Sequence, residues 1–165
     1  MSVDVTVEKE IRRERDAVSR FVTDPANDTR WITALTSVRT LDGGPVGVGT
    51  RVERVASFLG RRMEYVNEIV ELIPGERLAM RSVKAPFPME VTYEFEDAGE
   101  GTRMRIRAGG DAGGFYRVAG PLLGAAVRRG IEKDLSELKR VMEGGAVTGS
   151  VNLPGESLDG RPSIA

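Results

Sequence analysis

The spacing of apolar residues changes along the first part of the chain and predicts its secondary structure. Residues 3–7 alternate apolar and polar side chains, which is the period of a half-buried strand. Residues 14–23 then place apolar side chains on one face of a helix, and Asp24-Pro25 is typical of the start of a second helix. We therefore expect one strand followed by two short helices, the second of which carries Trp31.

The middle of the chain consists of short alternating segments separated by turns rich in glycine and proline. Such a pattern is typical of antiparallel strands joined by hairpins. The predicted strands are Thr36–Leu41, Thr50–Leu59, Arg62–Leu72, Arg77–Val83, Met89–Glu96 and Thr102–Ala108.

The pattern ends with a long helix predicted over Phe115–Met142, where apolar residues recur every three or four positions. Pro121 is expected to kink or restart this helix. After Glu143 the composition changes to Gly, Ser and Pro with isolated apolar residues. We therefore predict one domain over residues 1–143 and a disordered tail over residues 144–165.

Turn positions predict how the strands pair. A two-residue loop at Gly60-Arg61, with glycine first, predicts that Arg54 lies opposite Asn67. Pairing through the Pro74-Gly75 turn then places Asn67 beside Ser82. These three polar side chains would lie together on an otherwise apolar face of the sheet.

The last hairpin has a register that its charges specify. Glu96 opposite Arg103 and Glu94 opposite Arg105 match opposite charges on one face and leave Tyr93 on the apolar face. A slip by one residue would exchange the two faces. The sequence thus predicts a curved antiparallel sheet whose apolar inner face is covered by the long helix.

Composition narrows the chemistry that this fold could perform. The chain of 165 residues has the length of one domain and contains neither Cys nor His. This excludes disulfides, cysteine nucleophiles, Ser-His-Asp triads and the usual zinc ligand sets. The 24 basic and 25 acidic residues nearly balance, which is not typical of a nucleic-acid-binding protein. We therefore expect no metal, no cofactor and no nucleic-acid partner.

The chain contains no apolar run as long as a signal-peptide core or a membrane span. We therefore expect a cytoplasmic protein without a membrane-spanning segment. The sequence leaves open whether this protein is a monomer or a dimer.

The order of the predicted elements resembles the helix-grip fold of the START-like superfamily, which includes the polyketide cyclase/dehydrase family. Phe21–Trp31 (FVTDPANDTRW) resembles the family's junction between two helices, and Leu41–Arg51 (LDGGPVGVGTR) its glycine-rich turn. Leu72–Ala79 (LIPGERLA) resembles a third recurrent stretch. The resemblance covers about Val3–Glu143. It implies an α+β fold in which a curved seven-stranded antiparallel sheet wraps around a long C-terminal helix, with two short helices after the first strand.

The resemblance also implies a ligand cavity between the sheet and the long helix. Small residues among large ones on the inner face are consistent with such a cavity, whereas a solid core is the alternative. The candidate ligand-binding residues share the predicted inner face, the helix junction or the start of the long helix. They are Trp31 near the cavity mouth, Arg54, Phe58, Met63, Tyr65, Asn67, Ile69, Met80, Ser82, Val91, Tyr93, Met104, Ile106, Val118 and Leu122.

Arg54 has two interpretations, because a buried charge without a partner is costly. It could bind a carboxylate, phenolate or carbonyl group of a ligand, with Asn67 and Ser82 orienting that group. It could instead form an internal ion pair with Asp134 or Glu137 of the long helix, or extend its charge to the rim.

Three functions follow from these observations. The first is binding of a small hydrophobic or amphipathic molecule. The second is a cyclase or dehydratase that uses Tyr65, Tyr93 or Glu71, with Arg54, because the chain has no His or Cys. The third is a protein-interaction module similar to co-chaperone relatives, which would show a filled core and an exposed apolar patch.

Overall fold

The computed structural model describes residues 3–111, 115 and 120–151, and side chains as far as Gly144. It contains a single antiparallel sheet of seven strands in the order β1-β7-β6-β5-β4-β3-β2. In chain order the elements are β1 (Val3–Ile11), α1 (Arg15–Thr23), η1 (Pro25–Arg30), β2 (Leu35–Thr40), β3 (Arg51–Phe58), β4 (Arg61–Ile73), β5 (Arg77–Lys84), β6 (Met89–Ala98), β7 (Gly101–Gly110) and α3 (Gly120–Val151).

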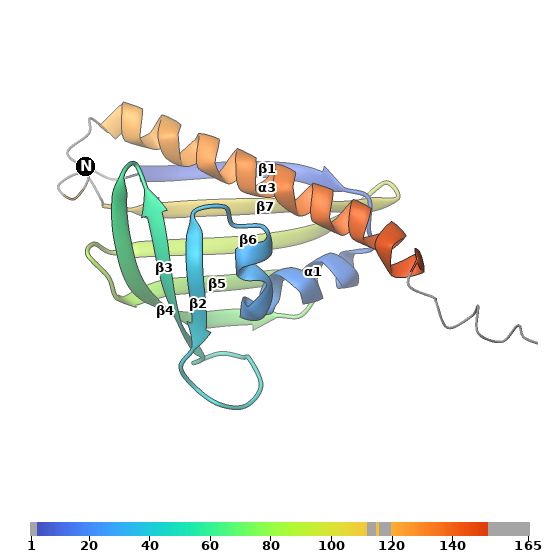
Figure 1. Cartoon of the computed structure of the whole chain (residues 1–165), viewed down its shortest axis with the longest axis horizontal. Helices are drawn as coiled ribbons and strands as arrows, with labels where there is room; N and C mark the ends of the chain where they lie inside the picture. Colours follow the sequence, from blue (N-terminus) through green and yellow to red (C-terminus); the bar gives the residue numbers. More distant parts are fainter. Residues whose placement is uncertain (1–2, 112–114, 116–119, 152–165) are drawn as a thin grey trace, which may run out of the picture.

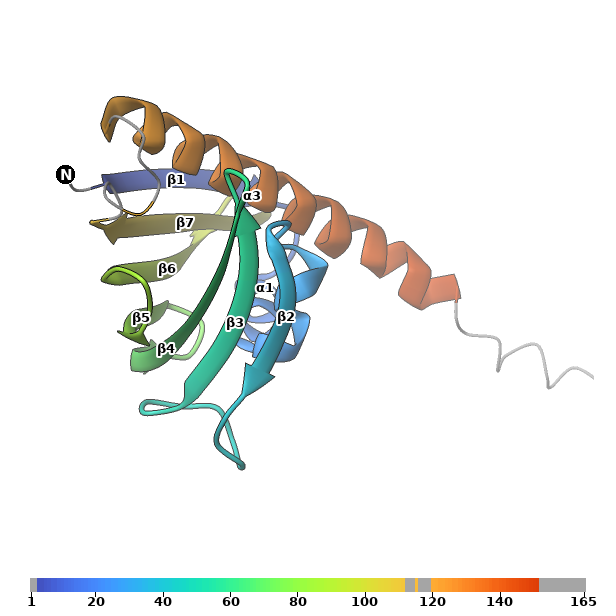
Figure 2. The same ribbon diagram turned by 60° about the vertical axis from the view of Figure 1, so that its left-hand side comes forward.

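The sheet is strongly curved, and α3 lies across its concave side (Figure 1). In the view turned by 60°, the strands form an open half-barrel and α3 runs beside β1 (Figure 2). The two edge strands, β1 and β2, are connected through α1 and η1. The predicted helix-grip architecture is therefore confirmed.

The β3–β4 hairpin corrects the predicted register. Its loop is Leu59-Gly60, and both residues have positive φ, 50° and 77°, as a type I′ turn requires. Arg54 consequently lies opposite Tyr65 and not opposite Asn67. The shift amounts to two residues, so every side chain keeps its predicted face although its cross-strand neighbour changes.

The other two predicted registers are confirmed. Asn67 lies opposite Ser82 across β4 and β5. Glu96 lies opposite Arg103, and Glu94 opposite Arg105, across β6 and β7. Ion pairs of 2.9 and 3.4 Å join these residues on the outer face.

Helix α3 ends later than predicted, and residues 116–119, before its first turn, lie outside the described ranges. Pro121 lies in its first turn, where the missing N–H of proline removes no helical hydrogen bond. The helix extends to Val151, beyond the predicted end at Met142 and beyond the start of the predicted tail. Residues 152–165 of that tail lie outside the described residues, and the domain boundary at residue 143 stays a prediction.

The interior is densely packed beside the second half of α3. Leu135 and Leu138 are fully buried there, in the same cluster as Ile11 and Met104. Hydrogen bonds to the end of β1 hold this part of the helix in place. The carboxylate of Glu143 accepts hydrogen bonds from the Arg12 amide at 2.8 Å and from Lys139 Nζ at 2.7 Å. Lys139 Nζ also donates to the Glu10 carbonyl at 3.1 Å. The side chain of Arg13 donates to the Met142 carbonyl at 2.7 Å.

Candidate functional site

The interior beside the first half of α3 is hollow. Along the inner face of β7 the side chains shrink from Met104 and Ile106 to Ala108 and Gly110, so the strand leaves progressively more space. Three adjoining cavities occupy this space. We call them the polar chamber, of about 140 Å³, the apolar chamber, of about 120 Å³, and the mouth, of about 440 Å³.

The polar chamber lies between η1, α3 and the middle strands of the sheet. Its polar lining comes from Arg54, Tyr65, Asn67, Tyr93 and Asp134. The remaining lining residues are apolar or aromatic and include Trp31, Ile32, Met80, Val91, Ile106, Ala108 and Ile131.

Arg54 forms a buried ion pair at the edge of the polar chamber. Its Nε and Nη2 both donate to Oδ2 of Asp28, at 2.9 and 2.7 Å. Only 6% of the Arg54 side chain and 2% of the Asp28 side chain are exposed. Burial raises the pKa of the Asp28 carboxyl and Arg54 opposes that shift, so the ion pair favours the charged form.

The partner of Arg54 therefore differs from both predicted carboxylates. Asp134 instead accepts hydrogen bonds from the amide and hydroxyl of Thr33, at 2.9 and 3.0 Å. Glu137 pairs with Arg140 on the surface of α3. Asp28 is on η1, which starts at Pro25 and has its first turn capped by the side chain of Asp24.

Three buried polar atoms beside the polar chamber have no hydrogen-bond partner within the described part of the chain. They are Nη1 of Arg54, Nε1 of Trp31 and Oδ1 of Asn67. The three residues are each 5% exposed or less. A buried polar group without a partner costs about 1–3 kcal/mol, so each of these atoms favours a hydrogen-bonding group in the chamber.

Two aromatic residues in the lining of the polar chamber pack against each other. Trp31 is 1% exposed and packs edge-on against Tyr93, with ring centroids 5.7 Å apart. Trp31 is therefore buried in the interior, whereas the sequence suggested a position near the cavity mouth. Burial raises the pKa of the Tyr93 hydroxyl well above its usual range, so this group stays protonated at neutral pH, where it can donate a hydrogen bond but cannot act as a base.

Asp134 is the carboxylate that lines both the polar chamber and the mouth. Burial raises the pKa of this carboxyl, although the two hydrogen bonds from Thr33 oppose the shift. A carboxylate whose pKa is raised is a stronger base than an ordinary aspartate, and at the edge of a cavity it can accept a proton from a bound molecule.

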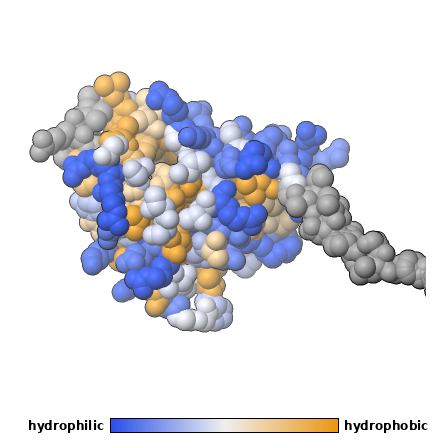
Figure 3. Space-filling model, viewed as in Figure 1, coloured by the Kyte–Doolittle hydropathy of each residue, from blue (hydrophilic) through white to orange (hydrophobic). Residues whose placement is uncertain are grey.

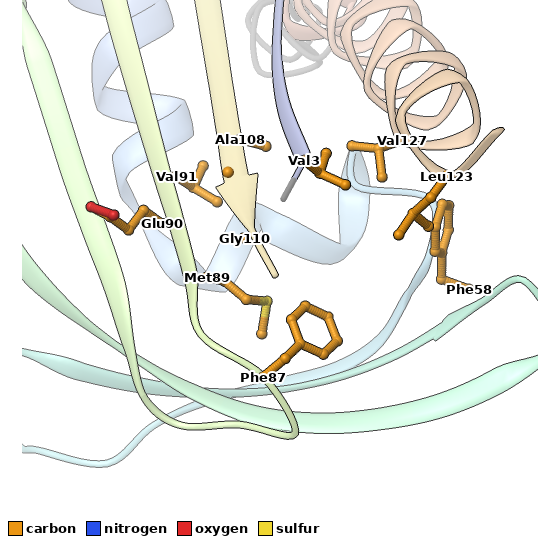
Figure 4. A pocket seen from close by; sticks show the side chains of 11 residues that line it. Val3, Phe58, Phe87, Met89, Glu90, Val91, Ala108, Gly110, Leu123 and Val127 are labelled. Atoms are coloured by element: carbon orange, nitrogen blue, oxygen red, sulfur yellow. The ribbon is translucent and has the colours of Figure 1, made fainter. Parts of the chain in front are cut away.

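The apolar chamber lies beside the first turns of α3. Figure 4 shows Leu123 and Val127 of α3 on one side of it, with Phe87, Met89 and Val91 on another. Val3, Phe58, Ala108, Gly109 and Gly110 complete the lining. Glu90 also borders this chamber, but its carboxylate points away from the other side chains (Figure 4).

The mouth opens between α3 and the β2–β3–β4 edge of the sheet. Gly130 of α3 and Phe58 of β3 both line it, and a Cβ on Gly130 would lie 3.6 Å from the Phe58 ring. A glycine inside a helix costs about 1 kcal/mol relative to alanine, so its place at this opening is consistent with a need for space. Hydrophobic side chains also reach the surface over the first turns of α3 (Figure 3).

Most sequence-predicted site residues line these cavities. They are Trp31, Arg54, Phe58, Met63, Tyr65, Asn67, Met80, Val91, Tyr93 and Ile106. Their role in binding a ligand stays a prediction.

The other candidates lie elsewhere. Ile69 and Met104 pack in the core. The Ser82 hydroxyl accepts from the Met89 amide at 3.0 Å, beside the β5–β6 connection. Leu122 is 66% exposed, because it lies on the outer side of the first turn of α3. Glu71 pairs with Arg77 at 2.6 Å, away from the cavities, and Val118 lies outside the described residues.

Sequence reasoning missed Asp28, Ile32, Leu123 and Ala108. The decreasing size of the β7 side chains could have indicated Ala108, since the inner face of that strand was identified correctly. The position of Asp28 depends on how η1 packs over β3, for which the sequence has no local signal.

No helix in the described ranges is long and apolar enough to cross a membrane. Among the same residues, no three carboxylates are grouped in a way that could hold a metal ion.

Comparisons with known proteins agree with this architecture. Residues 2–143 match the model of the family described as polyketide cyclase / dehydrase and lipid transport. No curated protein matches the chain.

Several solved structures are similar. A protein from Thermus thermophilus is 23% identical with a TM-score of 0.72, covering 86% of this chain and 98% of that one. A START superfamily protein from Mycobacterium smegmatis is 13% identical with a TM-score of 0.70, covering 86% and 97%. The Zhui aromatase/cyclase from Streptomyces sp. R1128 is 18% identical with a TM-score of 0.70, covering 86% and 96%. At such identities the likeness shows the fold alone. The match over residues 2–143 shows that the chain belongs to the polyketide cyclase / dehydrase and lipid transport family.

Proposed function

We propose that this protein binds a small, largely apolar molecule through a neutral oxygen-bearing group. The unpartnered atoms of Arg54, Trp31 and Asn67 carry this proposal. Two of them donate and one accepts, so a ligand hydroxyl that accepts from Arg54 or Trp31 and donates to Asn67 would satisfy two of the three. The cavities make a protein-interaction module, with its expected filled core, the weaker alternative.

The charges beside the chamber favour a neutral group over an anion. Asp28 already compensates the positive charge of Arg54. Asp134 places a second carboxyl group on the chamber wall. A bound carboxylate would therefore be desolvated beside two acidic groups and one basic group, which is unfavourable.

Binding of three probes with one tail and different heads tests this proposal. 4-Butylphenol should bind about tenfold more tightly than butylbenzene, since hydrogen bonds add roughly 0.5–1.5 kcal/mol each. 4-Butylbenzoate should bind more weakly than the phenol. Calorimetry measures the affinities, and the fluorescence of Trp31, the single tryptophan, reports occupancy of the polar chamber.

Variants on one strand provide the control. Asn67→Leu should reduce the affinity of 4-butylphenol to about that of butylbenzene. Glu68→Gln, on the outer face next to it, should leave all three affinities unchanged. Equal affinities of the phenol and the benzene in the natural protein, or tighter binding of the benzoate, would contradict the proposal.

A cyclase-type activity is the second candidate, and Asp134 is the observation that favours it. Its carboxylate could take a proton from a carbon between two carbonyl groups while Arg54 binds the enolate oxygen. The carbanion would attack a second carbonyl carbon, and the resulting alkoxide would take the proton back, so that a ring closes without any co-reactant.

Asp134→Asn separates the two candidate functions. With an aromatic poly-β-ketone as substrate, this variant should lose cyclisation by about 100-fold or more if Asp134 moves the proton. Binding of 4-butylphenol should be retained. Unchanged cyclisation, or none in the natural protein, would leave binding as the function.

A further inference from the structure

The polar and apolar chambers share a wall formed by two side chains. Val91 and Ala108 face each other across β6 and β7, and each lines both chambers. In Figure 4 both lie at the inner end of the apolar chamber. Neither residue is fully buried although both belong to the inner face, because the two chambers leave their surfaces uncovered.

Ala108 is the smaller part of this wall. Its inward neighbour on one side along β7 is Ile106, which is 4% exposed. On the other side is Gly110, where a Cβ would come within 2.6 Å of the Pro88 carbonyl oxygen. A larger side chain at residue 108 would extend into the space between the two chambers, because Ala108 lines both.

The two chambers differ in what they can hold. The polar chamber has three unpartnered hydrogen-bonding atoms, whereas the apolar chamber is walled by Val3, Phe58, Leu123 and other carbon side chains. A water molecule needs two to four polar partners, which these walls do not supply. The apolar chamber is thus suited to a hydrocarbon group.

We propose that Ala108 is a specificity-determining residue that lets an apolar arm of the ligand pass from the polar chamber into the apolar chamber. The ligand class is then an amphipathic molecule with an oxygen-bearing head and a narrow hydrocarbon arm. This inference rests on the proposed function, because the head must bind in the polar chamber. The size of residue 108 sets the longest arm that the protein accepts.

A series of 4-alkylphenols with tails from ethyl to octyl tests the inference. Each methylene that enters the apolar chamber should increase affinity about fourfold, until the chamber is full. Ala108→Leu should abolish this increase, whereas 4-ethylphenol, whose tail does not reach the apolar chamber, should lose far less affinity than its longer homologues. Leu123→Ala should extend the increase to longer tails, because it removes a side chain from the far wall.

Ala79→Leu is the matched control. It makes the same substitution on the outer face of β5, between the buried Leu78 and Met80, and should leave the series unchanged.

The outcomes separate this inference from the proposed function. If no alkylphenol binds the natural protein, the proposed function fails and the inference fails with it. If 4-ethylphenol binds but longer tails add no affinity, or if Ala108→Leu keeps the natural dependence on length, only the inference is overturned. Equal loss of all alkylphenols in a stably folded Ala108→Leu protein would also overturn it, since the head would then depend on residue 108.

Discussion

The two ends of the interior are built differently although one sheet and one helix form both. Beside the second half of α3, Leu135 and Leu138 pack in one cluster with Met104, and Glu143 accepts a hydrogen bond from the Arg12 amide just after β1. Beside the first half, β7 presents Ala108 and Gly110, and cavities remain. The comparison teaches that one end of a small domain can supply the packing energy while the other end keeps room for a ligand.

The buried ion pair between Asp28 and Arg54 stabilises the hollow end. Arg54→Met should destabilise the protein by about 3–5 kcal/mol, because it leaves the Asp28 carboxylate buried without a partner. This is the largest effect we expect, and it would show that the hollow end also depends on one core-like contact. Denaturant unfolding of the unliganded protein measures it.

The double variant Asp28→Asn, Arg54→Met is the control for this prediction. It removes both charges and should recover most of the lost stability. If Arg54→Met alone is as stable as the natural protein, Arg54 has no structural role.

A pair of alanine substitutions on α3 compares the two ends directly. Leu138→Ala should cost about 2–5 kcal/mol, because it opens a cavity in the filled end. Ile131→Ala should cost less than half as much, since Ile131 already borders a cavity and has fewer contacts to lose. Chemical denaturation of both variants tests the difference, and equal losses would contradict the contrast between the ends.

The hydrogen bonds of Glu143 make a smaller and pH-dependent contribution to the filled end. Lys139, followed by the Arg12 amide, lowers the pKa of the Glu143 carboxyl below its ordinary value of 4.5. A carboxyl group with a lowered pKa stabilises the fold above its ordinary pKa and loses that effect as pH falls through its folded pKa. Glu143→Gln should cost less than about 1 kcal/mol at pH 7. Its stability should converge with that of the natural protein in acid, as thermal melts at several pH values would show.

The smallest effect concerns the segment after Glu143. A truncation there should change the melting temperature by only a few degrees, because the sequence after Glu143 has no periodic apolar face that could offset the entropy of ordering it. If the melting temperature fell by more than about ten degrees, the filled end, and with it the domain, would extend beyond residue 143.

Local and cross-strand patterns predicted most of the fold. The Glu94–Arg105 and Glu96–Arg103 pairs specified the last hairpin, because only one register matches their charges. The β3–β4 register was wrong because Leu59 adopts positive φ, which a non-glycine residue rarely does and which no sequence pattern indicates.

The site was less predictable than the fold, for a physical reason. Alternation identified Arg54 and Asn67 as inward-facing, since the face of a strand residue is a local property. The partner of Arg54 is a tertiary property. Asp28 reaches it from η1, an element distant in sequence, and its carboxylate was not considered as a partner.

The fastening of α3 at Lys139–Glu143 has a kinetic consequence. Several hydrogen bonds hold α3 to the end of β1 near Lys139–Glu143, whereas in the described part of its first half the one from Arg128 to the Thr6 carbonyl, at 3.0 Å, joins it to that strand. The first half can therefore separate from the sheet while the filled end stays folded. Such local opening disrupts few contacts and is far more frequent than global unfolding. Amide hydrogens in the first turns of α3 should therefore exchange with solvent sooner than those around Leu138. A molecule in the cavities could then enter and leave at the rate of that local motion, independently of how stable the whole domain is.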